Sequence, residues 1–198
     1  MNYQEHKFEL PTLIDISPES LAIHLGLYGG YVKNFNATNA ALQELLKDPE
    51  KNTIAISELT RRLPFEFDGM RMHEYYFAQW EKEPTPFKQE GALASSLARQ
   101  YGSVEAWLKR FEQVGLMRGI GWANLYFDPQ AGEFHTVWVS DHELGHFAGL
   151  PVILALDMWE HAFLEQFGPA GKKAYIEACF KNYNWNVMEA RFASASKK

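Results

Sequence analysis

The sequence predicts an α+β protein in which a long N-terminal helical hairpin is followed by a C-terminal α/β domain with a three-stranded antiparallel sheet. Two observations carry this prediction. Apolar residues in the first half recur near the helical period of 3.6, and those of residues 122–156 switch to patterns typical of strands. A break at residues 82–86 (Lys-Glu-Pro-Thr-Pro) predicts two domains, spanning residues 1–84 and 85–198.

The first helix is expected over residues 18–46. Ser17 supplies a capping hydroxyl, Pro18 takes the first helical position, and apolar residues follow at positions 21, 25, 28, 32, 35, 42 and 45. Glycines inside this span, at positions 26, 29 and 30, each cost about 1 kcal/mol relative to alanine. They fit two interpretations equally well, a loop that divides two helices or a close approach by another element.

The remaining elements follow in order. A second helix after Pro64 carries its apolar residues on one face, and a third helix begins at Ser103. Two alternating segments around a turn at residues 128–132 predict a β-hairpin. A buried strand at residues 150–156 completes the sheet. Closing helices are expected near residues 158–167, 171–182 and 186–195.

The composition excludes several classes of protein. The 198 residues carry a formal charge of −6 and no Lys/Arg cluster longer than a pair, which argues against nucleic-acid binding because that binding needs a basic surface. Cys179 is the single cysteine, which argues against an internal disulfide framework and a multi-cysteine zinc site. The apolar stretch at residues 150–156 is far shorter than a membrane span of about 20 residues. Because the first residues lack the apolar run of a secretory signal, we expect a soluble, cytoplasmic protein without membrane contacts.

One local motif has the form H-E-x-x-H, at His142-Glu143-Leu-Gly-His146. On a helix this spacing places both histidines on one face to bind zinc, with the glutamate as the general base of a metallopeptidase. The expected strand immediately before the motif and the helix-weakening Gly145 disfavour that helix. A zinc metallopeptidase is therefore kept as the alternative function.

A second pattern joins Asp157 and His161. Asp157 follows the buried strand directly, at its carboxyl end, and His161 lies four residues further along. A carboxylate and an imidazole at this spacing can bind one metal ion. Spacing alone favours the simpler interpretation, in which Asp157 caps the following helix.

These residues also belong to a longer pattern. Asp157–Ala162 (D-M-W-E-H-A) resembles the D-x-W-E-H-A signature of the iron/manganese superoxide dismutases. Four further segments resemble signatures of the same family, in the same order, over about residues 10 to 195. They are Gly119–Ala123, Asn184-Trp185…Ala190-Arg191-Phe192, Ile23-His24 with Tyr31-Val32…Asn36, and Gly69…His73…Tyr76-Phe77.

The resemblance implies one manganese or iron ion per chain, held by three histidines, one aspartate and solvent at the interface of the two domains. Position by position, the implied ligands are His24, His73, Asp157 and His161. Three imidazoles and a carboxylate suit either metal. The implied reaction converts superoxide to dioxygen and hydrogen peroxide by cycling the metal between two oxidation states, which zinc, having no redox chemistry, does not support.

The resemblance also implies roles for two residues around the metal. Tyr31 matches a tyrosine that takes part in proton delivery. His142 matches the position from which a glutamine usually bonds the metal-bound solvent, because Gly69 leaves the alternative source of that glutamine empty. We therefore expect His142 to donate a hydrogen bond to the solvent and to Tyr31.

Further matched positions concern the walls of the site and the assembly. Trp122 and Trp159 match aromatic walls of the metal pocket. Glu160 matches a residue that reaches across a homodimer interface to the partner's ligand histidine, so a homodimer or a homotetramer is implied. Leu27 and Leu164 stand where the family usually has a histidine and a tyrosine, which predicts a more apolar entrance.

Overall fold

A computed structural model describes residues 2–197. The helices are α1 (Pro18–Leu45), α2 (Thr53–Ala78), α3 (Ala92–Tyr101), α4 (Val104–Gly115), α5 (Glu160–Phe167), α6 (Lys172–Asn182) and α7 (Trp185–Ala195), and the strands are β1 (Gly121–Asp128), β2 (Glu133–Ser140) and β3 (Val152–Asp157).

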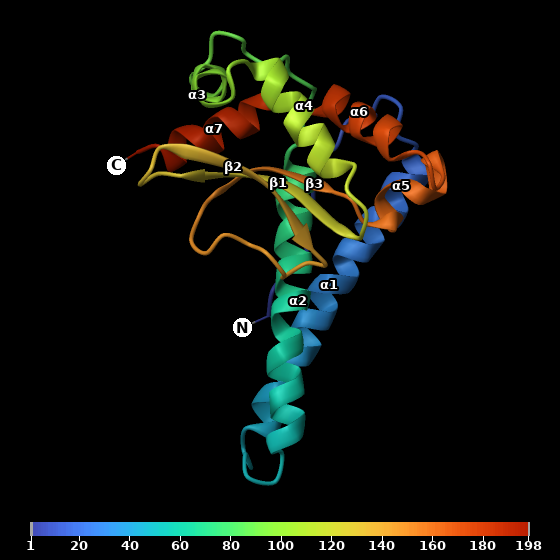
Figure 1. Cartoon of the computed structure of the whole chain (residues 1–198). Helices are drawn as coiled ribbons and strands as arrows, with labels where there is room; N and C mark the ends of the chain where they lie inside the picture. The colour runs from blue at the N-terminus through green and yellow to red at the C-terminus, as the bar shows by residue number, and fades with distance from the viewer. Residues whose placement is uncertain (1, 198) are drawn as a thin grey trace.

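Helices α1 and α2 lie side by side, and their connected ends project well beyond the rest of the molecule (Figure 1). Helix α1 begins as predicted, because the Ser17 hydroxyl accepts a hydrogen bond from the amide of Ser20 and Pro18 follows the cap. The helix is unbroken, so a loop at its glycines is wrong. A Cβ at Gly29 would meet only the end of the exposed Glu5 side chain, at 3.0 Å, and a Cβ at Gly26 or Gly30 would meet nothing within 4 Å, so close approach within the chain does not account for these glycines.

Helix α2 starts eleven residues before Pro64, which lies inside it. Its first part is largely exposed, with Ile54 81% accessible, because this end of the helix projects away from the core. After Pro64 the helix buries the predicted face, on which Met70, His73 and Phe77 are fully covered. The half of α2 that packs against the sheet is therefore the half with helical periodicity.

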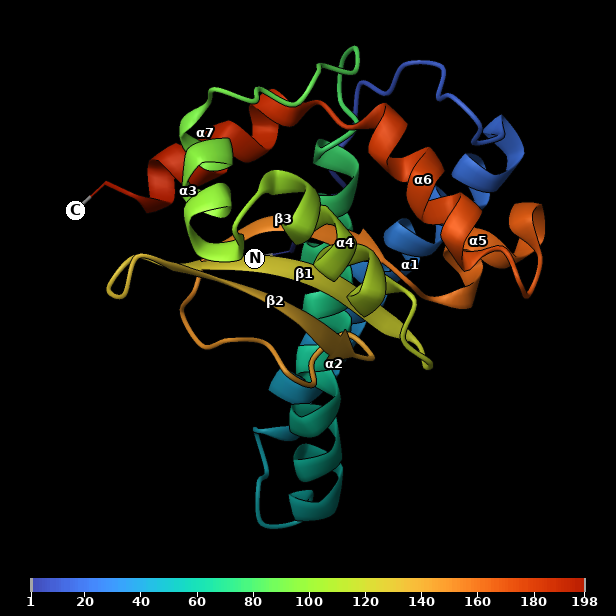
Figure 2. The ribbon, with the colours of Figure 1, turned by 45° about the horizontal axis from the view of Figure 1, so that its top comes forward.

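The sheet has the order β2-β1-β3 and is antiparallel throughout, which confirms the predicted three-stranded sheet. Figure 2 shows α4 on one face of the sheet and α2 on the other. Strand β3 is buried along its whole length, as expected for a strand covered on both faces. In the ladder, Trp122 of β1 pairs with Asp157, so one end of the sheet brings together residues distant in the sequence.

The closing helices α5, α6 and α7 lie where the sequence predicts them, within two residues at each end. Helix α3 was not predicted, although Leu93, Ala94 and Leu97 are completely buried against its neighbours. No helix within residues 2–197 is long and apolar enough to cross a membrane.

Candidate metal centre

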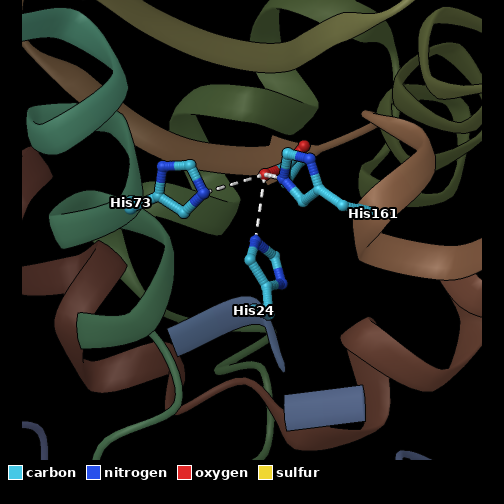
Figure 3. A group of neighbouring side chains, drawn as sticks. His24, His73 and His161 are labelled. Atoms are coloured by element: carbon cyan, nitrogen blue, oxygen red, sulfur yellow. Dashed lines mark hydrogen bonds and ion pairs between the residues drawn. The ribbon is translucent and has the colours of Figure 1, made fainter. Parts of the chain in front are cut away.

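Four side chains from four elements meet between the helical pair and the sheet. His24 comes from α1, His73 from α2, Asp157 from the end of β3 and His161 from the first turn of α5. Their potential ligand atoms all lie within 4.8 Å of one another. Figure 3 shows the three imidazole rings directed at a common point.

The Asp157 carboxylate is the centre of this cluster. Its Oδ2 lies 3.1 Å from Nε2 of His24, 3.1 Å from Nε2 of His161 and 3.5 Å from Nε2 of His73. Its other oxygen, Oδ1, accepts a hydrogen bond from the Trp159 amide just before α5. One oxygen therefore faces the imidazoles, and the other holds the residue that precedes α5. The N-cap of α5 is Trp159, without a side-chain cap bond, so the interpretation of Asp157 as the cap of this helix is wrong.

The protonation of His73 shows that the cluster fits a metal ion. Its Nδ1–H donates to the carbonyl oxygen of Gly69 at 2.6 Å, so the neutral ring has an unprotonated Nε2. That buried nitrogen has no hydrogen-bond partner among the described residues. A lone pair left free at the centre, on a ring oriented by a backbone carbonyl, is the arrangement of a metal-binding histidine.

The charges of the cluster agree with this conclusion. Burial lowers the pKa of His24 and of His73, so both imidazoles are neutral at physiological pH. Burial opposes the ionisation of Asp157, but the neighbouring His161 and His24 outweigh it and hold the pKa of that carboxyl well below its usual range. Neutral imidazoles and an ionised carboxylate are the forms that bind metals, and this mixed nitrogen and oxygen set suits manganese or iron.

His142 and Tyr31 lie together beside the cluster and are hydrogen-bonded to each other. Trp122 and Tyr31 engage both ring nitrogens of His142, so the expected bond from His142 to metal-bound solvent has no N–H left to make it. The indole N–H of Trp122 donates to Nδ1 of His142 at 3.0 Å, which leaves the proton of the neutral ring on Nε2. This Nε2–H donates to the Tyr31 hydroxyl at 2.6 Å. Burial lowers the pKa of His142 to about 4 and raises that of Tyr31 above its usual value, so the pair is neutral.

The matched tryptophans border this pair and the cluster. The Trp159 ring stacks on His142 with 4.5 Å between ring centroids and lies 5.7 Å from His161. The Trp122 ring lies 5.2 Å from His73, nearly perpendicular to it. Glu160 is exposed, and its contact with a partner subunit stays a prediction.

Two neighbours of the site were missed by the sequence analysis. The Phe65 ring lies 4.8 Å from that of His142 and 6.1 Å from that of Tyr31. The guanidinium of Arg62 lies 3.8 Å from the centre of the Phe65 ring, where it pairs with Glu66 and contributes positive charge near His142. The available signal was position alone, since Phe65 lies about two helical turns before His73 on the same helix.

The H-E-x-x-H segment does not form a zinc site. Residues 141–144 form a turn instead of the helix that a metallopeptidase needs. Both ring nitrogens of His142 are engaged by Trp122 and Tyr31, and both of His146 by the Tyr126 hydroxyl and the His142 carbonyl. The structure therefore gives no support to the alternative function.

A buried cluster of three imidazoles and one carboxylate, placed between a helical pair and a small antiparallel sheet, defines a transition-metal protein. Comparison with known proteins is more specific. Residues 89–191 match the family described as iron/manganese superoxide dismutases, C-terminal domain.

Relatives extend this match over most of the chain. An iron superoxide dismutase of Cupriavidus metallidurans is 36% identical over 85% of this chain and 83% of its own. An iron superoxide dismutase of Saccharolobus solfataricus is 32% identical over 96% of both chains, and a manganese superoxide dismutase of Haloferax volcanii is 32% identical over 84% of this chain and 81% of its own. The chain belongs to the iron/manganese superoxide dismutase family, a family of oxidoreductases.

Proposed function

We propose that the chain is a superoxide dismutase that holds one manganese or iron ion between His24, His73, Asp157 and His161. The observation that carries the proposal is the convergence of three imidazole nitrogens on one buried carboxylate oxygen in a member of this family. When bound, the ion supplies redox chemistry, as superoxide reduces and reoxidises it in turn and yields dioxygen and hydrogen peroxide.

The protein's own residues would supply protons, since hydrogen peroxide carries two that superoxide lacks. The Nε2–H of His142 donates to the oxygen of Tyr31, so the phenolic O–H of Tyr31 is left to donate elsewhere. The Tyr31 ring lies 5.1 Å from that of His73, beside the cluster. Tyr31 is thus placed to pass a proton into the site, with His142 holding its oxygen, while Trp122 and Trp159 limit the access of water.

The donor set fits both metals, and relatives named for iron and for manganese both match the chain. Metal analysis of untagged protein, measured per chain beside dismutase activity, tests the proposal. We expect manganese or iron near one ion per chain with activity in proportion. Stoichiometric zinc in a protein that stays inactive after reloading with manganese or iron would contradict it.

A substitution at one ligand tests the site itself. His161→Ala removes an imidazole whose Nε2 lies 3.1 Å from Asp157, and we expect loss of both metal retention and dismutation. Tyr101→Phe serves as the control, because Tyr101 bonds Thr136 between α3 and β2, away from the cluster. Full activity in the His161→Ala variant would refute the ligand assignment.

We also propose a homodimer or homotetramer in the cytoplasm, with no nucleic-acid partner and with Glu160 bonding the partner's copy of the ligand histidine. Exposed apolar residues support the assembly, because Leu27 of α1 and Leu164 of α5 are each 37% accessible and Ile23 of α1 is 50% accessible. We propose as well that the chain divides into two domains between residues 84 and 85. The N-terminal domain then supplies His24 and His73, and the C-terminal domain supplies Asp157 and His161.

A further inference from the structure

His146 has no role in the proposed reaction, yet both of its ring nitrogens are engaged beside the site. Its Nε2–H donates to the main-chain carbonyl of His142 at 2.7 Å. Its Nδ1 is therefore unprotonated and accepts from the hydroxyl of Tyr126 at 2.5 Å. The Tyr126 oxygen in turn accepts from the side-chain amide of Asn124 at 3.2 Å.

These bonds have one consistent direction, from Asn124 through Tyr126 and His146 to the His142 carbonyl. The Asn124 amide donates to the Tyr126 oxygen, the Tyr126 hydroxyl donates to Nδ1 of His146, and Nε2–H of His146 donates to the carbonyl. The Asp68 carboxylate also faces His146, but it lies 4.0 Å from Nε2, beyond hydrogen-bond distance. The carbonyl of His142 is therefore the acceptor that orients the ring.

The same strand holds His142 by its side chain. Trp122, Asn124 and Tyr126 alternate along β1, so their side chains leave one face of the strand. Trp122 bonds the imidazole of His142, while Tyr126 reaches its main chain through His146. His142 itself lies between β2 and β3 in a turn that the backbone bridge between Ser140 and Leu144 closes at its ends. Inside that turn, the His146 ring adds a side-chain hydrogen bond to the His142 carbonyl.

We propose that Tyr126 and His146 are positioning residues for the dismutase reaction, which fix the main chain of His142 so that its Nε2–H stays on the Tyr31 oxygen. The inference rests on the proposed function, because it assigns these residues to proton delivery by Tyr31. It assigns His146, the second histidine of the H-E-x-x-H segment, a structural role that does not involve zinc. Tyr126 and His146 would thereby maintain the distance of 2.6 Å between Nε2 of His142 and the Tyr31 oxygen.

The proposal is tested with three metal-loaded variants, Tyr126→Phe, His146→Ala and His146→Gln. Tyr101→Phe is the control, because it also removes a tyrosine hydroxyl but lies away from the cluster. Displacement by about 1 Å can cost up to 100-fold in a positioned step, so we expect kcat at saturating superoxide to fall about tenfold in Tyr126→Phe and His146→Ala. Metal content and kcat/KM at low superoxide should stay near those of the wild type. Glutamine keeps an N–H near the position of Nε2, so His146→Gln should recover much of the kcat that His146→Ala loses.

Crystal structures of the same metal-loaded variants give a readout independent of activity. We expect the distance from His142 Nε2 to the Tyr31 oxygen to lengthen in His146→Ala and to be restored in His146→Gln. An unchanged distance and unchanged kcat in His146→Ala would overturn the proposal. So would an equal fall of kcat and kcat/KM accompanied by metal loss, which would mark a purely structural role.

The two proposals fail separately. A wild-type protein that binds neither manganese nor iron, or that binds them without dismutation, refutes the proposed function whatever the variants do. A fully active wild type whose variants match Tyr101→Phe refutes only the positioning role. If Tyr126→Phe does not fold, the paired His146 variants decide the question by themselves.

Discussion

The His142 imidazole links the chemistry of the site to its stability, because burial lowers its pKa to about 4 from the usual 6.5. In the unfolded chain the same group binds a proton near pH 6.5. Between pH 6.5 and 4 the unfolded state therefore holds more protons than the folded state. The free energy of unfolding must fall as the pH drops through this window.

The His142→Gln variant isolates this contribution. We expect the metal-free wild type to lose more stability than metal-free His142→Gln when the pH is lowered from 7 to 4, because glutamine does not titrate. His24 and His73 titrate with the same sign and remain in both proteins, so the variant's slope should be smaller but not zero. Urea denaturation at several pH values measures both slopes, and parallel slopes would contradict the assignment.

Glycine 69 is a second residue whose effect is local and specific. A Cβ at this position would lie 2.5 Å from Cδ1 of the Tyr31 ring, so a side chain here must displace Tyr31. We expect Gly69→Ala to lower the free energy of unfolding by about 1–3 kcal/mol and to reduce kcat as the Tyr31 hydroxyl moves away from His142. Thermal melts and steady-state kinetics measure the two effects.

Gly26 in α1 is the control for this substitution. A Cβ at Gly26 meets nothing within 4 Å in its own chain, so Gly26→Ala introduces no clash there and improves helix propensity. We expect it to leave kcat unchanged and to stabilise the helix by up to about 1 kcal/mol. Equal losses in both variants would show that the contact with Tyr31 does not matter.

At the scale of elements, the sequence predicts the helices and strands whose apolar residues form a recognisable pattern because they face the core. The hairpin was found from its alternating segments around a turn, and the third strand from a continuous apolar run that is buried at every position. The first part of α2 was missed because it projects from the core and has no apolar face to bury. Helix α3 was missed although Leu93, Ala94 and Leu97 have helical spacing and are buried, so the signal for this helix was present in the sequence.

The site divides in a similar way. His24, His73, Asp157 and His161 were proposed together from the resemblance, and the structure brings them together. The contact of Phe65 with His142 and that of Tyr126 with His146 could not be foreseen, because each joins side chains from different parts of the fold. Spacing along the chain carries no information about such contacts when the partners come from different elements.

At the scale of the whole molecule, a metal bound by four elements should stabilise the folded chain. A ligand that binds only the native state adds about 4 kcal/mol when present at 1,000 times its Kd. For a chain of this size that corresponds to a rise in Tm of roughly 10 °C. Calorimetry before and after chelation and reloading measures the shift, and His161→Ala should show almost none. An equal shift in His161→Ala would place the stabilising metal elsewhere.

The proposed assembly makes a separate prediction. Leu164 is exposed on α5, one turn after Glu160, so a charge there would be buried at a dimer interface built around that helix. We expect Leu164→Glu to sediment as a monomer while the wild type sediments as a dimer or larger. Ile54→Glu, at the far end of the helical pair, should leave the dimer intact, and a wild type that sediments as a monomer would refute the assembly.

The wide separation of the four cluster residues also sets an order of events during synthesis. His24 and His73 lie in the first half of the chain, but Asp157 and His161 are made only after the sheet's first two strands. A nascent chain on the ribosome lacks the carboxylate that gathers the imidazoles until translation is nearly finished. The complete set of four proposed ligands therefore exists only after strand β3 and the start of α5 have been made.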